Sequence, residues 1–162
     1  MGATKVILIG GGVAVIAGFA YYKYAQSNFG IQYTGFNITN VSPDYKVIDL
    51  NIEFSLSSKA GLIFNVKGMQ FNIYANGALV GTGQLPEPIN IPANGTIPIV
   101  IQSRISLSAI TGSLFSTLLN QITGGQPLSI LIEGAAQVSV NLPLISFFTL
   151  NYPFAQTEAL PL

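Results

Sequence analysis

The chain contains no cysteine and no histidine among its 162 residues. Without cysteine it has no disulfide, no thiolate nucleophile and no zinc–thiolate site. Without histidine it lacks the commonest general base near neutral pH and the commonest ligand of transition metals. Both absences argue against catalysis, and we therefore expect a protein that is not an enzyme and that uses neither a metal nor another cofactor.

Charged residues are also scarce, at 7% of the chain with a formal net charge of zero, where about a quarter is usual. Beyond Tyr24 the only basic residues are Lys46, Lys59, Lys67 and Arg104. Four scattered bases form no basic patch, which argues against nucleic acid as a partner. A surface with so few charges depends on Ser, Thr, Asn and Gln for solubility, or is covered by neighbouring proteins.

The remaining candidates for chemistry are weak. Asp49 and Glu53 lie on the same face of a predicted strand but about 13 Å apart, beyond the separation of glycosidase carboxylate pairs. The chain has no Gly-x-Ser-x-Gly turn, so no serine is set up as a nucleophile. The Gly10-Gly11-Gly12 run has no Lys-Ser/Thr after it and lies in an apolar segment, so it is not a phosphate loop. We predict no catalytic site and no small-molecule substrate.

A long apolar run without any charge extends from Val6 to Tyr22. Its 17 residues make roughly 25 Å of helix, at the short end of what crosses a hydrocarbon core. A cleavable signal peptide is the alternative, because Gly18-Phe19-Ala20 has the small-x-small form of a cleavage site. We predict a retained membrane anchor with an aromatic belt and a snorkelling lysine at its end. The residues assigned to the anchor are Val6, Ile7, Leu8, Ile9, Val13, Val15, Ile16, Phe19, Tyr21, Tyr22 and Lys23.

Small residues recur every fourth position within this run, at Gly10, Ala14 and Gly18. Such a small-xxx-small ridge permits close contact between membrane helices. The hypothesis is that the ridge packs against another helix, either from a second copy of the chain or from a partner.

These features predict four regions: a short tail over residues 1–5, the transmembrane anchor helix over 6–24, a polar neck over 25–30 and one folded domain over 31–162. The neck is short enough to keep the domain close to the bilayer. Basic residues are nearly balanced across the anchor, so the side of the membrane that holds the domain is not predicted.

Strand patterns dominate the folded domain. From Val47 to Ser57 apolar and polar residues alternate strictly, which is typical of a strand with one buried face. The apolar residues then change from even-numbered to odd-numbered positions at Gly68, which indicates a β-bulge. Asn76-Gly77 is a strong signal for a type I′ hairpin turn, with Leu79 to Gly83 as the returning strand.

The second half of the domain is predicted to hold three more strands and one helix. A strand runs from Ile97 to Leu107 with Ser103 in its inner row, and further strands cover Leu128–Val140 and Phe147–Phe154. Between them, Ser108 to Gln121 has apolar residues at helical spacing, with Ser108 as N-cap and Gly124-Gly125 as the stop. We predict an all-β, antiparallel β-sandwich with one short amphipathic helix covering one end.

Two segments of this domain resemble a known family. Two stretches are similar to motifs of the water-stress and hypersensitive-response (WHy) domain: the hairpin Asn72-Ile73-Tyr74-Ala75-Asn76-Gly77-Ala78-Leu79-Val80-Gly81-Thr82-Gly83 and the loop Pro88-Ile89-Asn90-Ile91-Pro92-Ala93-Asn94-Gly95-Thr96. This domain has the type 2 late-embryogenesis-abundant fold. The resemblance covers roughly residues 31–162. The chain departs from the family pattern at Ser57-Ser58-Lys59, where Asn-Pro-Asn is usual.

The resemblance implies a fibronectin-like sandwich without enzymatic chemistry, which serves in stress protection and occurs also as a membrane-tethered domain. Two functions follow. In the first, the domain is a structural and interaction module of a membrane-associated assembly, of which a membrane-containing virus particle is one setting. In the second, it is a membrane-tethered module for desiccation protection or lipid interaction. The expected partners are the lipid bilayer and other proteins, including further copies of the chain.

Overall fold

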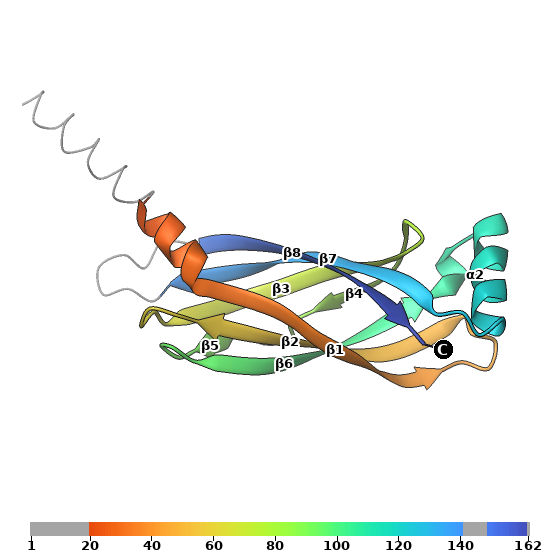
Figure 1. Cartoon of the computed structure of the whole chain (residues 1–162), viewed down its shortest axis with the longest axis horizontal. Coiled ribbons are helices and arrows are strands. Elements are labelled where there is room, and N and C mark those ends of the chain that lie inside the picture. The colour runs from red at the N-terminus through yellow and green to blue at the C-terminus, as the bar shows by residue number, and fades with distance from the viewer. Residues whose placement is uncertain (1–19, 141–148, 162) are drawn as a thin grey trace, which may run out of the picture.

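The computed structural model describes residues 20–140 and 149–161. The fold is mostly β, with a helical segment over residues 20–28 before the first strand and one short helix between two later strands (Figure 1). Its elements are β1 (Phe29–Val41), β2 (Val47–Ser58), β3 (Phe64–Ala75), β4 (Ala78–Gln84), β5 (Ile89–Ile91), β6 (Thr96–Ser106), the 3₁₀ turn η1 (Leu107–Ala109), α2 (Ser113–Thr123), β7 (Leu128–Val140) and β8 (Thr149–Leu160).

The strands form one continuous antiparallel sheet that curls into a half-barrel, rather than the two packed sheets expected from the sequence (Figure 1). The order is β1-β2-β6-β4-β3-β7-β8, with β5 paired to β3. Strands β1, β2 and β6 form one half of this sheet, and β4, β3, β7 and β8 form the other. The β4–β6 pair joins the two halves, and in it Gly81 lies opposite Ile105. A Cβ on Gly81 would lie 2.4 Å from the Arg104 carbonyl oxygen, so only glycine lets the two backbones approach this closely.

The inner face of the curled sheet holds the hydrophobic core. The apolar residues that alternate along β2 are all buried, at 1% exposure or less, which confirms the predicted strand. Aromatic rings from distant strands meet inside the curl, with Phe29 and Tyr152 at 5.1 Å and Phe54 and Phe154 at 5.4 Å between ring centroids. These contacts join β1 and β2 to β8 at the far edge of the sheet, so packing of side chains maintains the curl.

The predicted hairpin and bulge are both present. Asn76 and Gly77 have φ of 47° and 80°, the positive values that a type I′ turn requires, and they connect β3 directly to β4. The register of β3 against β7 shifts between Val66 and Gly68, which confirms the predicted bulge.

The helix begins later than the sequence predicted. Ser108 lies in the 3₁₀ turn and Ile110 has extended backbone and is buried, so the chain only enters α2 at Ser113. Gly112 is the N-cap residue, with a φ of 76° that favours glycine. The expected stop at Gly124-Gly125 is confirmed, with Gly125 at a φ of 75°. The helix covers one end of the half-barrel through buried Leu118 and Ile122 (Figure 1).

Residues 20–28 are helical and lead directly into β1, which starts two residues before the predicted domain boundary. Ala25 is 1% exposed and belongs to the core, so this segment packs on the end of the sheet opposite α2 (Figure 1). No helix in residues 20–140 or 149–161 is long and apolar enough to cross a bilayer. Most of the predicted anchor, including Gly10, Ala14 and Gly18, lies outside the described residues.

The turn at Ser57-Ser58-Lys59, where the sequence departs from the family pattern, is held by polar contacts. The buried Ser58 hydroxyl donates to the Leu62 carbonyl, and the Lys59 amide donates to the Asn28 carbonyl at 2.9 Å. The Asn94 side chain accepts a hydrogen bond from the Gly61 amide at 2.9 Å. Serine and asparagine therefore provide the turn contacts at this position.

Candidate functional site

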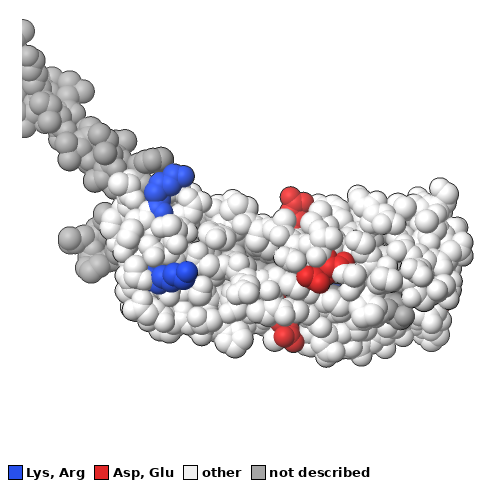
Figure 2. All heavy atoms as spheres, in the orientation of Figure 1, with Lys and Arg blue, Asp and Glu red and all other residues white. Residues whose placement is uncertain are grey.

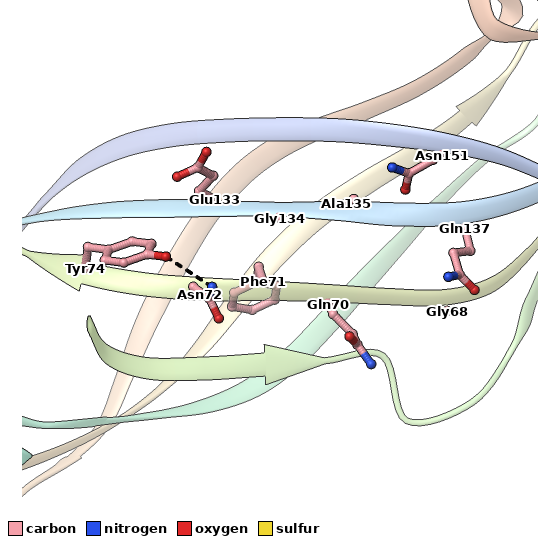
Figure 3. Close-up of a pocket in the computed structure, with 10 residues that line it drawn as sticks. All are labelled: Gly68, Gln70, Phe71, Asn72, Tyr74, Glu133, Gly134, Ala135, Gln137 and Asn151. Carbon is pink, nitrogen blue, oxygen red and sulfur yellow. Dashed lines mark hydrogen bonds between the residues drawn. The ribbon is translucent and has the colours of Figure 1, made fainter. Parts of the chain in front are cut away.

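A shallow polar pocket lies on the outer face of the sheet, over β3, β7 and the start of β8 (Figure 3). We call it the amide trough; its volume is about 560 Å³. Its lining residues are Gly68, Gln70, Phe71, Asn72, Tyr74, Glu133, Gly134, Ala135, Gln137 and Asn151. The strand alternation that buries one side of β3 and β7 places the amide side chains on the opposite side, facing solvent.

Strand register brings the lining residues together from distant parts of the chain. Gln70 pairs with Ala135 and Asn72 with Glu133 across the β3–β7 ladder, and Gln137 pairs with Asn151 across β7–β8. These residues belong to β3, β7 and β8, and each of these strands is hydrogen-bonded to at least one neighbouring strand. The sheet therefore fixes the backbone positions of the lining residues.

Two glycines shape the trough. A Cβ on Gly134 would lie 2.1 Å from the Gln70 carbonyl oxygen and 2.5 Å from the Phe71 Cβ, so no larger residue fits there. At the bulge, a Cβ on Gly68 would meet no atom within 4 Å. The absence of a side chain at Gly68 therefore leaves open space at this end of the trough.

Most of the polar side chains in the trough are available to a ligand. The Asn72 amide donates to the Tyr74 hydroxyl at 3.1 Å (Figure 3). The side chains of Gln70, Gln137 and Asn151 make no hydrogen bond to any other described residue. Each primary amide has two N–H donors and a carbonyl acceptor. Three of the four amides in the trough therefore present both functions to solvent.

Charge is nearly absent from this surface. Glu133 is the one ionisable carboxylate in the trough, and neither lysine nor arginine lines it. Figure 2 shows one face of the molecule, where the basic side chains of the described residues lie near the N-terminal helical segment, the acidic ones lie farther along, and the other described residues in view are uncharged. The lining of the trough and the face seen in Figure 2 therefore carry little charge.

The acidic residues that the sequence offered for chemistry are not arranged for it. Arg104 lies 2.6 Å from the Asp49 carboxylate, and its hydrogen bond lowers the pKa of Asp49 below the ordinary value. Asp49 is therefore an ionised partner in a surface ion pair rather than a proton donor. Within residues 20–140 and 149–161, no three acidic side chains gather as metal ligands would.

Tyr33 is the one strongly shifted group in the described chain. Burial raises the pKa of its hydroxyl to about 12, and the negative charges of Glu158 and Glu53 act in the same direction. The hydroxyl oxygen is buried and has no hydrogen-bond partner among the described residues. Tyr33 therefore stays protonated at neutral pH and offers no phenolate base.

Of the residues predicted to form sites, only Tyr21, Tyr22 and Lys23 lie in the described chain, in the helix over residues 20–28. Tyr22 packs against the core, and the ring of Tyr21 contacts that of Tyr24 at 6.2 Å. The other anchor residues and the small-residue ridge lie outside the described residues. The sequence reasoning missed the amide trough. The signal for it was the outward row of Gln and Asn on β3 and β7, but the pairing of these strands was not predicted.

Comparison with models of known protein families shows to which family the chain belongs. The model of the late embryogenesis abundant protein family matches residues 60–155. The chain belongs to this family. The match includes the hairpin and the Ile-Pro-Ala-Asn-Gly loop on which the resemblance was based, and it confirms that assignment. No curated protein sequence matches the chain.

Three solved structures share the fold. A protein from Archaeoglobus fulgidus aligns over 83% of this chain and 94% of its own, with 12% identity and a TM-score of 0.51. A structural-genomics target aligns over 85% and 89%, with 10% identity and a TM-score of 0.58. A protein from Arabidopsis thaliana, solved in solution, aligns over 82% and 80%, with 18% identity and a TM-score of 0.51. At these identities the likeness concerns the fold alone.

Proposed function

We propose that this late embryogenesis abundant domain is a membrane-tethered, non-catalytic interaction module that protects other macromolecules under water stress. The family match supports stress protection and interaction with other molecules, and it lends no support to a virus particle as the setting of the assembly module predicted from the sequence. The protected molecule is called the client below.

The observation that carries the proposal is the neutral, amide-rich outer face of the sheet, centred on the amide trough. Side-chain amides and hydroxyls replace the hydrogen bonds that a client surface makes with water. Because this surface carries little charge, it can form such hydrogen bonds with clients of either net charge. Two of the acids, Asp44 and Asp49, are neutralised by Lys46 at 3.3 Å and Arg104 at 2.6 Å, which reduces the field further.

The tether is proposed from the apolar run at residues 6–24. Residues 20–28 suit a short connection to such an anchor, because they are helical and Ala25 is buried in the core, so this segment is packed on the domain. Such a docked helix holds the domain at a set distance from the bilayer.

A drying assay tests protection. A soluble enzyme that loses activity on drying is dried and rehydrated with the full chain, and the recovered activity is measured. We expect recovery to rise with the wild-type chain and to fall when Gln70 and Gln137 are both replaced by Lys. Replacing exposed Gln32 and Asn37 on β1 by Lys adds the same charge away from the trough and serves as the control. Equal recovery with both double variants would overturn the role of the trough.

Membrane fractionation tests the tether separately. We expect the full chain to stay in the membrane pellet after alkaline carbonate washing, and a variant lacking residues 6–19 to be released. Release of the full chain would refute the tether but leave the protective role of the domain intact.

Association in an assembly is proposed from the ridge of Gly10, Ala14 and Gly18. Replacing Gly10 and Gly18 by Leu should weaken the association of gently extracted chains, because larger side chains hold the helices apart. Native mass measurement gives the stoichiometry. An unchanged mass distribution would refute the packing role of the ridge.

A further inference from the structure

The amide trough has the dimensions of a ligand site. Its volume of about 560 Å³ falls within the range of pockets that hold small molecules. It is shallow and lies across three strands, so it suits part of an extended molecule that lies along the sheet surface (Figure 3).

The chemistry of the lining excludes several ligand classes. An anion would find no lysine or arginine in the trough. A divalent cation would find a single carboxylate, Glu133, where calcium takes six to eight oxygen ligands. An apolar ligand would cover the amides of Gln70, Gln137 and Asn151 without giving them hydrogen-bond partners, and the Phe71 ring below the trough is only 3% exposed.

What remains is a neutral ligand that both donates and accepts hydrogen bonds. The free amides of Gln70, Gln137 and Asn151 each offer both functions, as does each hydroxyl of a polyol. Tyr74 adds a half-buried ring, whose hydroxyl accepts from Asn72 and keeps its own proton to donate. A cyclic polyol can place the C–H groups of one ring face against such an aromatic surface while its hydroxyl groups hydrogen-bond the amides.

We propose that the amide trough binds a neutral saccharide. Gln70, Gln137 and Asn151 hydrogen-bond its hydroxyls, Tyr74 packs against the face of one sugar ring, and the lack of a side chain at Gly68 leaves room for the ligand. The inference uses the same surface as the proposed function but does not require the tether or the client. Because the trough is open to water, the affinity is modest, with a Kd on the order of 1 mM.

Titration with sugars tests the site. The full chain, isotope-labelled and held in lipid nanodiscs free of sugar detergents, is titrated with maltose, cellobiose and sucrose, and followed by NMR. We expect at least one disaccharide to give saturable shifts in the side-chain amide signals of Gln70, Gln137 and Asn151. Glycerol at equal hydroxyl concentration serves as the control for solvent effects. The absence of saturable shifts with all three sugars would overturn the proposal.

A variant that fills the trough sharpens the test. Gly68→Leu places a side chain in the open space, where a Cβ meets nothing within 4 Å and the backbone conformation is open to other residues. We expect at least a tenfold weaker affinity with an unchanged melting temperature. The matched control is Gln32→Leu on the exposed face of β1, which should bind as the wild type does. Wild-type affinity in folded Gly68→Leu would contradict the assignment.

The drying assay distinguishes this inference from the proposed function. If Gly68→Leu loses sugar binding and still protects the client, the trough is a saccharide site and protection comes from the rest of the outer face. If no sugar binds and the Gln70, Gln137 double variant still loses protection, the saccharide assignment is wrong and the protective role stands.

Discussion

Gly134 lines the amide trough at a position where no side chain fits. Any Cβ at this position would lie 2.1 Å from the Gln70 carbonyl oxygen, which belongs to the backbone of β3 and has no room to move. We expect Gly134→Ala to lower the free energy of unfolding by about 1–3 kcal/mol through overpacking. Urea denaturation measures the change, and Gly68→Ala is the matched control because its Cβ enters open space. Equal losses in both variants would contradict the close approach of β3 and β7.

Asp49 gives the domain a predictable sensitivity to acid. The hydrogen bond from Arg104 lowers the pKa of Asp49 in the folded state, below the value near 3.9 of an unfolded aspartate. Its stabilising contribution is therefore present above about pH 4 and is lost as the pH falls through the folded pKa. We expect Asp49→Asn to flatten the decline of the urea midpoint below pH 4. Some decline should remain, because the hydrogen bond from Ser42 also lowers the pKa of Asp44. An identical acid profile in the variant would disprove the role of the pair.

Tyr33 makes the stability of the domain sensitive to alkali, whereas Asp49 makes it sensitive to acid. Its folded pKa of about 12 lies above the unfolded value of 10, so its contribution is present below pH 10 and is lost as the pH rises toward 12. We expect Tyr33→Phe to flatten the loss of stability in that window. At neutral pH the variant should be as stable as the wild type or slightly more so, because a buried hydroxyl without a partner is removed. Strong destabilisation at neutral pH would indicate that the hydroxyl has a partner.

At the scale of elements, α2 is a lid held by few contacts. Leu118 is fully buried and Ile122 nearly so, while the other residues of the helix are exposed or only partly buried. We expect Leu118→Ala to speed amide hydrogen exchange in α2 and at the start of β7, because a cavity there costs about 2–5 kcal/mol and the helix opens locally. Exposed Asn120→Ala is the control. Uniform acceleration across the whole sheet would instead show that α2 unfolds only together with the rest of the domain.

Local patterns predicted the elements well where one face of a strand is buried. The alternation in β2, the Asn76-Gly77 turn and the bulge at Gly68 are all determined by neighbours in the sequence, and all are confirmed. The start of the helix was wrong, since apolar spacing did not reveal that Ile110 is extended and buried before Gly112 redirects the chain. Boundaries of this kind depend on tertiary contacts that a periodicity does not contain.

At the scale of the whole molecule, the single sheet and the amide trough were beyond sequence reasoning. Whether strands form two sheets or one depends here on the β4–β6 joint at Gly81, a contact between distant segments. The trough likewise exists only because β3 pairs with β7 and β7 with β8. Composition did predict a surface that relies on amides and hydroxyls, but not where these side chains gather.

The central claim is that the neutral outer face around the amide trough is the surface that contacts other molecules. Cross-saturation NMR tests it directly, with the isotope-labelled chain in lipid nanodiscs and an unlabelled, partly dehydrated client enzyme. We predict that saturation transfers to the outward residues of β3, β7 and β8, with Gln70, Asn72 and Gln137 among the strongest. Transfer confined to α2 or to exposed apolar side chains such as Leu79 and Val100 would contradict the claim.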